Sequence, residues 1–141
     1  MKMTNAVKLT VAAMTATFGL VIAAIAQNTA DTLPPASTKQ GVTYATDIKA
    51  ILDASCVKCH SGDKPKARLK LDTLADTLKP IKGGSIIKSG DSANSLIVKI
   101  TAHLTPDQET WMPPLKNKAG IKPLTPEQIG LIRAWIDQGA K

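Results

Sequence analysis

The pentapeptide Cys56-Val57-Lys58-Cys59-His60 constrains this chain more than any other stretch. Its C-x-x-C-H pattern is typical of covalent c-type haem attachment. Two thiols separated by two residues lie on a single turn of chain, so both can add to the vinyl groups of one porphyrin. The histidine that follows is then carried under the iron as its proximal axial ligand. The motif therefore predicts one covalent haem c, held by Cys56, Cys59 and His60.

Other uses of the two cysteines are weaker interpretations. Both cysteines lie in the motif, so none is left to form a disulfide elsewhere. A Cys56–Cys59 disulfide, or a thioredoxin-like redox pair, is one alternative. That redox pair follows a strand, whereas the residues before Cys56 have a helical pattern. A zinc site needs two more ligands, and beyond His60 the sequence offers only His103.

Residues 1–26 are predicted to be a secretory signal peptide. Lys2 and Lys8 give it a positive start, an apolar run follows, and Ala24-Ile25-Ala26 provides a small-x-small cleavage pattern. The alternative is an uncleaved membrane anchor, because the apolar run approaches the length that spans a bilayer. The leader predicts a periplasmic or otherwise exported protein, with membrane contact only if this segment is retained.

Residues 27–41 are polar, contain Pro34-Pro35 and show no apolar periodicity, so a flexible linker is expected there. Residues 42–141 are predicted to form one mainly α domain. A short two-stranded ribbon between residues 69–71 and 86–87 is the only β structure that we expect. The first predicted helix begins near Tyr44, with Thr43 or Thr46 as cap, and runs directly into Cys56. The second covers residues 73–78 with Asp72 as cap, and a third is opened by Asp91 or Ser92. The last is predicted from a Thr125 cap, Pro126 at its first position and Gln128 at the capping-box position, with Trp135 in its buried apolar stripe.

The formal charge of the chain is +7, of which Lys2 and Lys8 in the leader contribute two. A basic ring near a haem edge would attract redox partners with acidic docking surfaces. An ordinary solvated loop is an equally good interpretation. Nucleic-acid binding is poorly supported, because no aromatic residues are interleaved with the basic ones. The basic residues near the motif are Lys58, Lys64, Lys66, Arg68 and Lys70.

Met112 is the candidate for the sixth iron ligand. It is the only methionine left once the leader is removed, and Pro113-Pro114 stiffens the chain that follows it. Met112 could instead simply fill core space. His103, near the end of a predicted helix, is the rival ligand. Trp111 is expected to pack on the porphyrin or to donate its indole N–H to a propionate.

Several motifs in order resemble the planctomycete-type cytochrome c domain. They run from the pentapeptide through Leu69-Lys70-Leu71-Asp72, Gly90-Asp91-Ser92 and Met112-Pro113-Pro114 to the last helix. The resemblance covers about residues 42–141 and implies a class I cytochrome c-like fold, with helices around one haem, His60 proximal and Met112 distal. It also agrees with export, because bacterial c-type haem attachment takes place outside the cytoplasm. The usual Gly-Pro after the haem motif is absent, which leaves Pro65 as the candidate to support the His60 imidazole.

Taken together, these patterns predict an exported mono-haem electron carrier with His/Met ligation and no catalytic activity of its own. The alternative is a haem-based sensor or small-ligand-binding module in which Met112 is displaceable. A small haem peroxidase ranks last, because the Met112 region offers no acid–base residue except the nearby Glu109.

Overall fold

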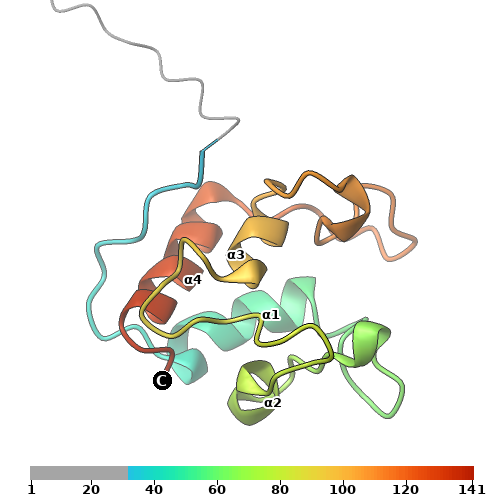
Figure 1. Ribbon diagram of the computed structural model, residues 1–141, viewed down its shortest axis with the longest axis horizontal. Coiled ribbons are helices and arrows are strands. Elements are labelled where there is room, and N and C mark those ends of the chain that lie inside the picture. Colours follow the sequence, from blue (N-terminus) through green and yellow to red (C-terminus); the bar gives the residue numbers. More distant parts are fainter. Residues whose placement is uncertain (1–31) are drawn as a thin grey trace, which may run out of the picture.

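The computed structural model describes residues 32–141, so the predicted leader lies outside the described part of the chain. These residues form a mainly α structure without a sheet, which confirms the predicted fold class (Figure 1). Its elements are the π-helical turn η2 (Tyr44–Ile48), α1 (Lys49–Ser55), the 3-10 turn η3 (Lys66–Arg68), α2 (Leu74–Leu78), α3 (Leu96–Thr101), the 3-10 turn η4 (Gln108–Thr110) and α4 (Pro126–Asp137).

The first helical segment is η2 followed without a break by α1. Thr43, one of the two predicted caps, caps this segment: its side chain accepts a hydrogen bond from the Thr46 backbone N–H. The helix buries Ile48 and Leu52 completely and ends at Ser55. Cys56 is its C-cap, so the predicted helix delivers the haem-attachment motif from a packed element.

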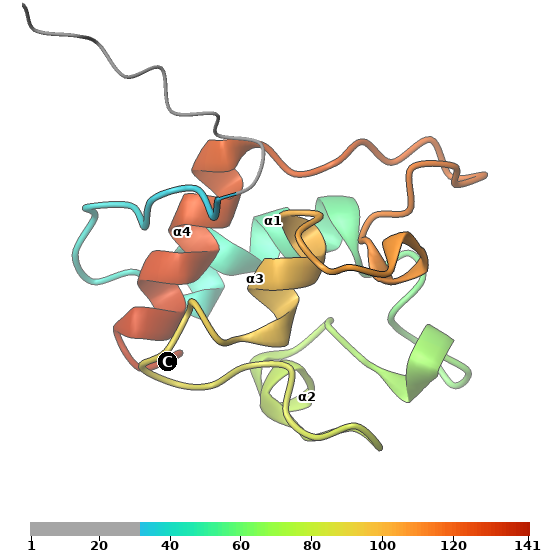
Figure 2. The same cartoon turned by 45° about the horizontal axis from the view of Figure 1, so that its top comes forward.

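The last helix, α4, forms the centre of the packed core. Thr125 and Gln128 make the predicted reciprocal capping box, and Pro126 occupies the first turn. Trp135 is fully buried, as expected, and its ring lies 6.1 Å from that of Tyr44 in η2. α4 also contacts α3, so it joins the segment before the motif to the segment after it (Figures 1 and 2).

Two predicted helix caps are wrong. Thr73, and not Asp72, caps α2 by accepting from the Asp76 backbone N–H. The helix predicted to open at Asp91 or Ser92 begins only at Leu96, after the N-cap residue Ser95. The Asp91 carboxylate instead accepts the N–H of Asn94 at 3.1 Å and stabilises a separate turn before the helix.

The two-stranded ribbon is also absent from the described residues, which contain one isolated β-bridge between Ile81 and Gly84. The backbone groups that would have formed the ribbon are used elsewhere. The Leu71 N–H donates to the His60 carbonyl at 2.8 Å, and the Ile86 carbonyl accepts from Ile97 N–H at 3.0 Å. These two segments are therefore tied to the haem-attachment motif and to α3, and not to each other.

The part of the predicted linker that the structure describes lies against α4 (Figures 1 and 2). The Ser37 N–H donates to the Gly130 carbonyl at 2.8 Å, and the Arg133 guanidinium donates to the Pro34 carbonyl. Residues 34–37 are thus attached to the domain and do not act as a free spacer. Within residues 32–141, no helix is both long and apolar enough to cross a membrane.

Candidate functional site

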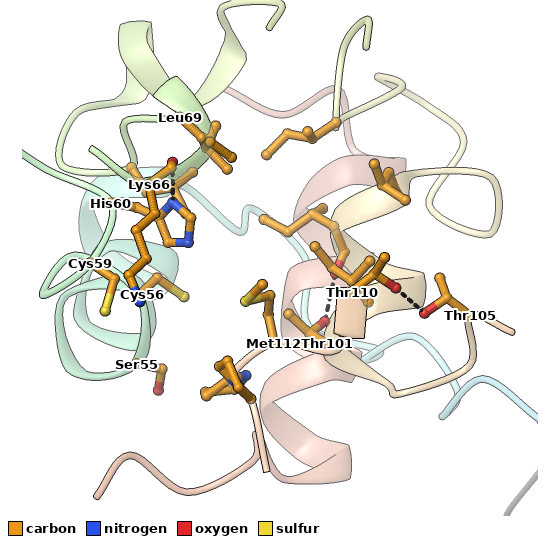
Figure 3. Close-up of a pocket in the computed structure, with 18 of the residues that line it drawn as sticks. Ser55, Cys56, Cys59, His60, Lys66, Leu69, Thr101, Thr105, Thr110 and Met112 are labelled. Carbon is orange, nitrogen blue, oxygen red and sulfur yellow. Dashed lines mark hydrogen bonds between the residues drawn. The ribbon is translucent and has the colours of Figure 1, made fainter. Parts of the chain in front are cut away.

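An apolar cavity of about 730 Å³ opens between the haem-attachment motif and the segment after α3. Its walls come from separate parts of the chain that the fold brings together. One wall carries Cys56, Cys59 and His60, and the facing wall carries Thr101, Thr110 and Met112 (Figure 3). The volume lies in the range of roughly 300–1,000 Å³ that is usual for ligand and cofactor sites.

The motif forms one further turn of chain after α1. The Cys56 N–H donates to Leu52 O at 2.8 Å, and the His60 N–H donates to Cys56 O at 3.0 Å. Both thiols are free, and both cysteines line the cavity. Burial raises the pKa of the Cys56 thiol to about 12, so this group is a neutral thiol at neutral pH.

The His60 ring is held by the backbone that follows the motif. Its Nδ1 lies 3.2 Å from the Lys66 carbonyl oxygen, and this contact makes Nδ1 the protonated nitrogen. Burial lowers the pKa of His60, which favours the neutral imidazole. The other nitrogen, Nε2, lies on the cavity side and is available as a metal ligand (Figure 3).

Met112 approaches the cavity from a loop anchored to α3. Its N–H donates to the Ile100 carbonyl at 3.0 Å, near the C-terminal end of that helix. Pro113 and Pro114 continue the same wall. The structure therefore brings together the four residues that sequence reasoning assigned to the haem: Cys56, Cys59, His60 and Met112.

Comparison with known families supports the c-type cytochrome class. The family model described as planctomycete cytochrome C matches residues 56–116, from the first motif cysteine to just beyond Met112-Pro113-Pro114. This part of the chain is a planctomycete-type cytochrome c domain. The prediction from the pentapeptide that the chain is a c-type cytochrome is thereby confirmed.

Among solved structures, hydrazine synthase of Kuenenia stuttgartiensis is similar to the cytochrome domain. The alignment covers 70% of this chain at 27% sequence identity, with a TM-score of 0.47. It spans 16% of the hydrazine synthase chain. No curated protein gives a significant match.

His103, the alternative to Met112 as sixth iron ligand, does not line the cavity. Its ring stacks on Trp111 with centroids 4.8 Å apart and an interplanar angle of 8°. The role expected for Trp111 is also wrong, because Trp111 does not line the cavity and its indole N–H donates to the Thr105 carbonyl at 3.0 Å. The two rings thus stack on each other next to Met112 in the chain and do not line the cavity.

Sequence reasoning missed several parts of the site. The Lys66 carbonyl, and not Pro65, supports the His60 ring. Sequence could not predict this partner, because every residue has a backbone carbonyl and only the path of the loop decides which one lies near the ring. Asn117 was also missed: its side chain bonds Pro114 O and Ile121 O at 2.8 Å each, and Ile121 N–H at 2.9 Å. These three hydrogen bonds, called the Asn117 clasp below, hold the loop after Met112 in shape. The only sign of them in the sequence is an asparagine in a stretch without periodicity.

The zinc alternative finds no support in the described residues. Across residues 32–141, no group of three or more His, Cys, Asp or Glu side chains is arranged to hold a metal ion.

Proposed function

We propose that this protein is an exported electron carrier with one covalent haem c, ligated by His60 and Met112. One observation carries the proposal: the cavity-side nitrogen of His60 and the side chain of Met112 line facing walls of a single cavity, beside two free thiols (Figure 3). An imidazole and a thioether are a known axial pair, which raises the reduction potential.

The residues of the cavity fit a haem. Two free thiols with C-x-x-C spacing suit two thioether bonds, and the remaining lining is mostly apolar, as a porphyrin face requires. A bound haem would supply the iron that cycles between ferrous and ferric states. The chain's own contribution is to hold both axial ligands, to orient His60 through the Lys66 carbonyl and to keep water from the iron.

Export and partner choice extend the proposal. The leader at residues 1–26 supports an envelope location, since c-type haem attachment in bacteria takes place outside the cytoplasm. The exposed side chains of Lys58, Lys64 and Lys66 lie in or just after the haem-attachment motif and suit redox partners with acidic docking surfaces. We propose electron transfer and not catalysis, because Met112 on the facing wall would occupy the sixth position of the iron, although the acidic residues Asp107 and Glu109 also line the cavity.

Absorption spectra of the purified protein and of Met112→Leu test the ligation. We expect the wild-type protein to be low-spin and six-coordinate in both oxidation states and to resist carbon monoxide. Met112→Leu conserves side-chain volume but removes the sulfur ligand, so its ferrous form should bind carbon monoxide readily. The far-ultraviolet circular dichroism of both proteins checks that the fold is kept.

Two results would contradict the assignment in different ways. An unchanged spectrum in Met112→Leu would remove Met112 as the ligand, and His103→Phe would then be tested for loss of the low-spin spectrum. Rapid binding of carbon monoxide by the wild-type ferrous protein would favour the sensor or ligand-binding alternative, in which Met112 leaves the iron.

A further inference from the structure

A second cavity, of about 320 Å³, lies beside the haem cavity and is strongly basic. It is formed by the loop around η3, by the end of α2 and by the turn that follows α2. Ile81 lines both cavities, so the two adjoin at this residue. The other residues that line it are Pro65, Arg68, Lys70, Asp76, Lys79, Pro80 and Lys82.

Four cationic side chains and one carboxylate line this cavity, which leaves an excess of positive charge. In the described part of the chain, the ion pairs join Lys39 to Asp47 and Lys49 to Asp53, so none involves the four cations. The single carboxylate, Asp76, accepts a hydrogen bond from the Thr73 hydroxyl at 2.8 Å. The cavity therefore carries a net positive charge, which a bound anion would compensate.

The backbone fixes the positions from which these cations project. Two hydrogen bonds between Ile81 and Gly84, of 3.1 and 2.9 Å, close the turn that contains Lys82. The Lys79 N–H donates to Asp76 O at 3.2 Å at the end of α2. The Arg68 backbone lies in the left-handed region with φ of 56°, a conformation that costs energy for any residue other than glycine.

From this cavity, we infer a binding site for a free divalent oxyanion of the phosphate or sulfate class. A guanidinium fork together with ammonium groups is the donor set that recognises such oxyanions. A concave site of this size admits a small anion, which cationic residues from the η3 loop and from the turn after α2 can contact from different sides. The inference does not depend on the proposed His/Met ligation.

Occupation of the site would also affect the haem. An anion close to the iron centre stabilises the more positive ferric state, so its binding lowers the reduction potential. By reciprocity, the ferric protein would bind phosphate more tightly than the ferrous protein. This second consequence does rest on the proposed function.

Titration of the purified holoprotein with inorganic phosphate, at constant ionic strength set with chloride, tests the site. The informative variant is Lys79→Gln/Lys82→Gln. Its matched control is Lys116→Gln/Lys118→Gln, which removes the same charge from exposed positions outside both cavities. Calorimetry or amide chemical shifts give the dissociation constant for phosphate.

We expect saturable binding that weakens roughly five- to tenfold in Lys79→Gln/Lys82→Gln and changes less than about twofold in the control. Equal losses in both variants, or no saturable binding by the wild-type protein, would overturn the site. Phosphate binding without a downward shift in potential would leave the site standing and overturn its coupling to the haem.

Discussion

At the scale of a single residue, His103 is expected to support the Met112 loop through its stack on Trp111. It follows the end of α3 with φ of 57°, a left-handed conformation in which glycine is the usual residue. Its Nε2 atom is buried without a hydrogen-bond partner among the described residues. Both features are costly, and the gain visible in the structure is the stack on Trp111, next to the proposed ligand.

Removal of this stack should loosen the hold on Met112 without unfolding the protein. His103→Gly relieves the left-handed backbone but deletes the ring, so we expect exogenous imidazole to displace Met112 from the ferric iron roughly three- to tenfold more readily. His103→Phe keeps an aromatic partner and should stay near the wild-type affinity. Equal imidazole affinities in wild type and His103→Gly would show that the stack does not position Met112, provided that Met112→Leu has established the ligation.

At the scale of elements, the N-terminal segment and α4 are fitted to each other at Gly130. A Cβ atom built at this glycine would lie 2.7 Å from the Pro35 carbonyl oxygen, closer than real contacts allow. The absence of a side chain therefore lets residues 34–37 lie on the helix and form the Ser37–Gly130 hydrogen bond. Position 130 is buried, so the helix cannot relieve such a clash by turning the new methyl group towards solvent.

Gly130→Ala should destabilise the domain by about 1–3 kcal/mol, because the added methyl group must push the segment off the helix. Urea denaturation measures the change. The control is the same substitution in a protein whose residues 34–37 are replaced by Gly-Ser-Gly-Ser. There the clash is gone, and alanine should be neutral or stabilise the helix by up to about 1 kcal/mol. Equal destabilisation in both backgrounds would mean that the segment does not pack on α4.

The elements also show which parts of the fold the sequence predicts. α4 was predicted with its cap because Thr125, Pro126 and Gln128 form a local pattern that needs no tertiary information. The prediction of a ribbon between residues 69–71 and 86–87 was wrong because strand pairing depends on which other segments of the folded chain lie next to each strand. Here the nearest partners are the haem-attachment motif and α3. The predicted caps Asp72 and Asp91 or Ser92 were wrong because several residues that can cap a helix lie close together in each stretch, and local preference does not choose among them.

Four residues that line the cavity could be named from the sequence, because the C-x-x-C-H motif and the lone methionine outside the predicted leader are recognised by residue type alone. Cys56, Cys59, His60 and Met112 were named from the sequence, and the structure brings them to one cavity. The supporting groups were not predictable: the Lys66 carbonyl, the Asn117 clasp and the second cavity depend on the path of the backbone.

At the scale of the whole molecule, residues 32–141 form a packed core with a cavity beside it. The core lies around α4, η2 and α1, and Trp135, Ile48 and Leu52 are fully buried in it. The haem cavity is the space that this core leaves open between the attachment motif and the Met112 loop. With only four aromatic residues in the chain, a bound porphyrin is well placed to supply the apolar bulk that the side chains do not.

The central claim is that Cys56 and Cys59 bind one haem covalently in this cavity. Intact-mass spectrometry under denaturing conditions tests it on protein purified from cells that attach haem to a control cytochrome. We expect a single species with the mass of the polypeptide plus one haem, and the polypeptide alone for Cys56→Ala/Cys59→Ala. The claim would be contradicted by an unmodified wild-type polypeptide, by more than one haem per chain, or by haem that stays bound when both cysteines are replaced.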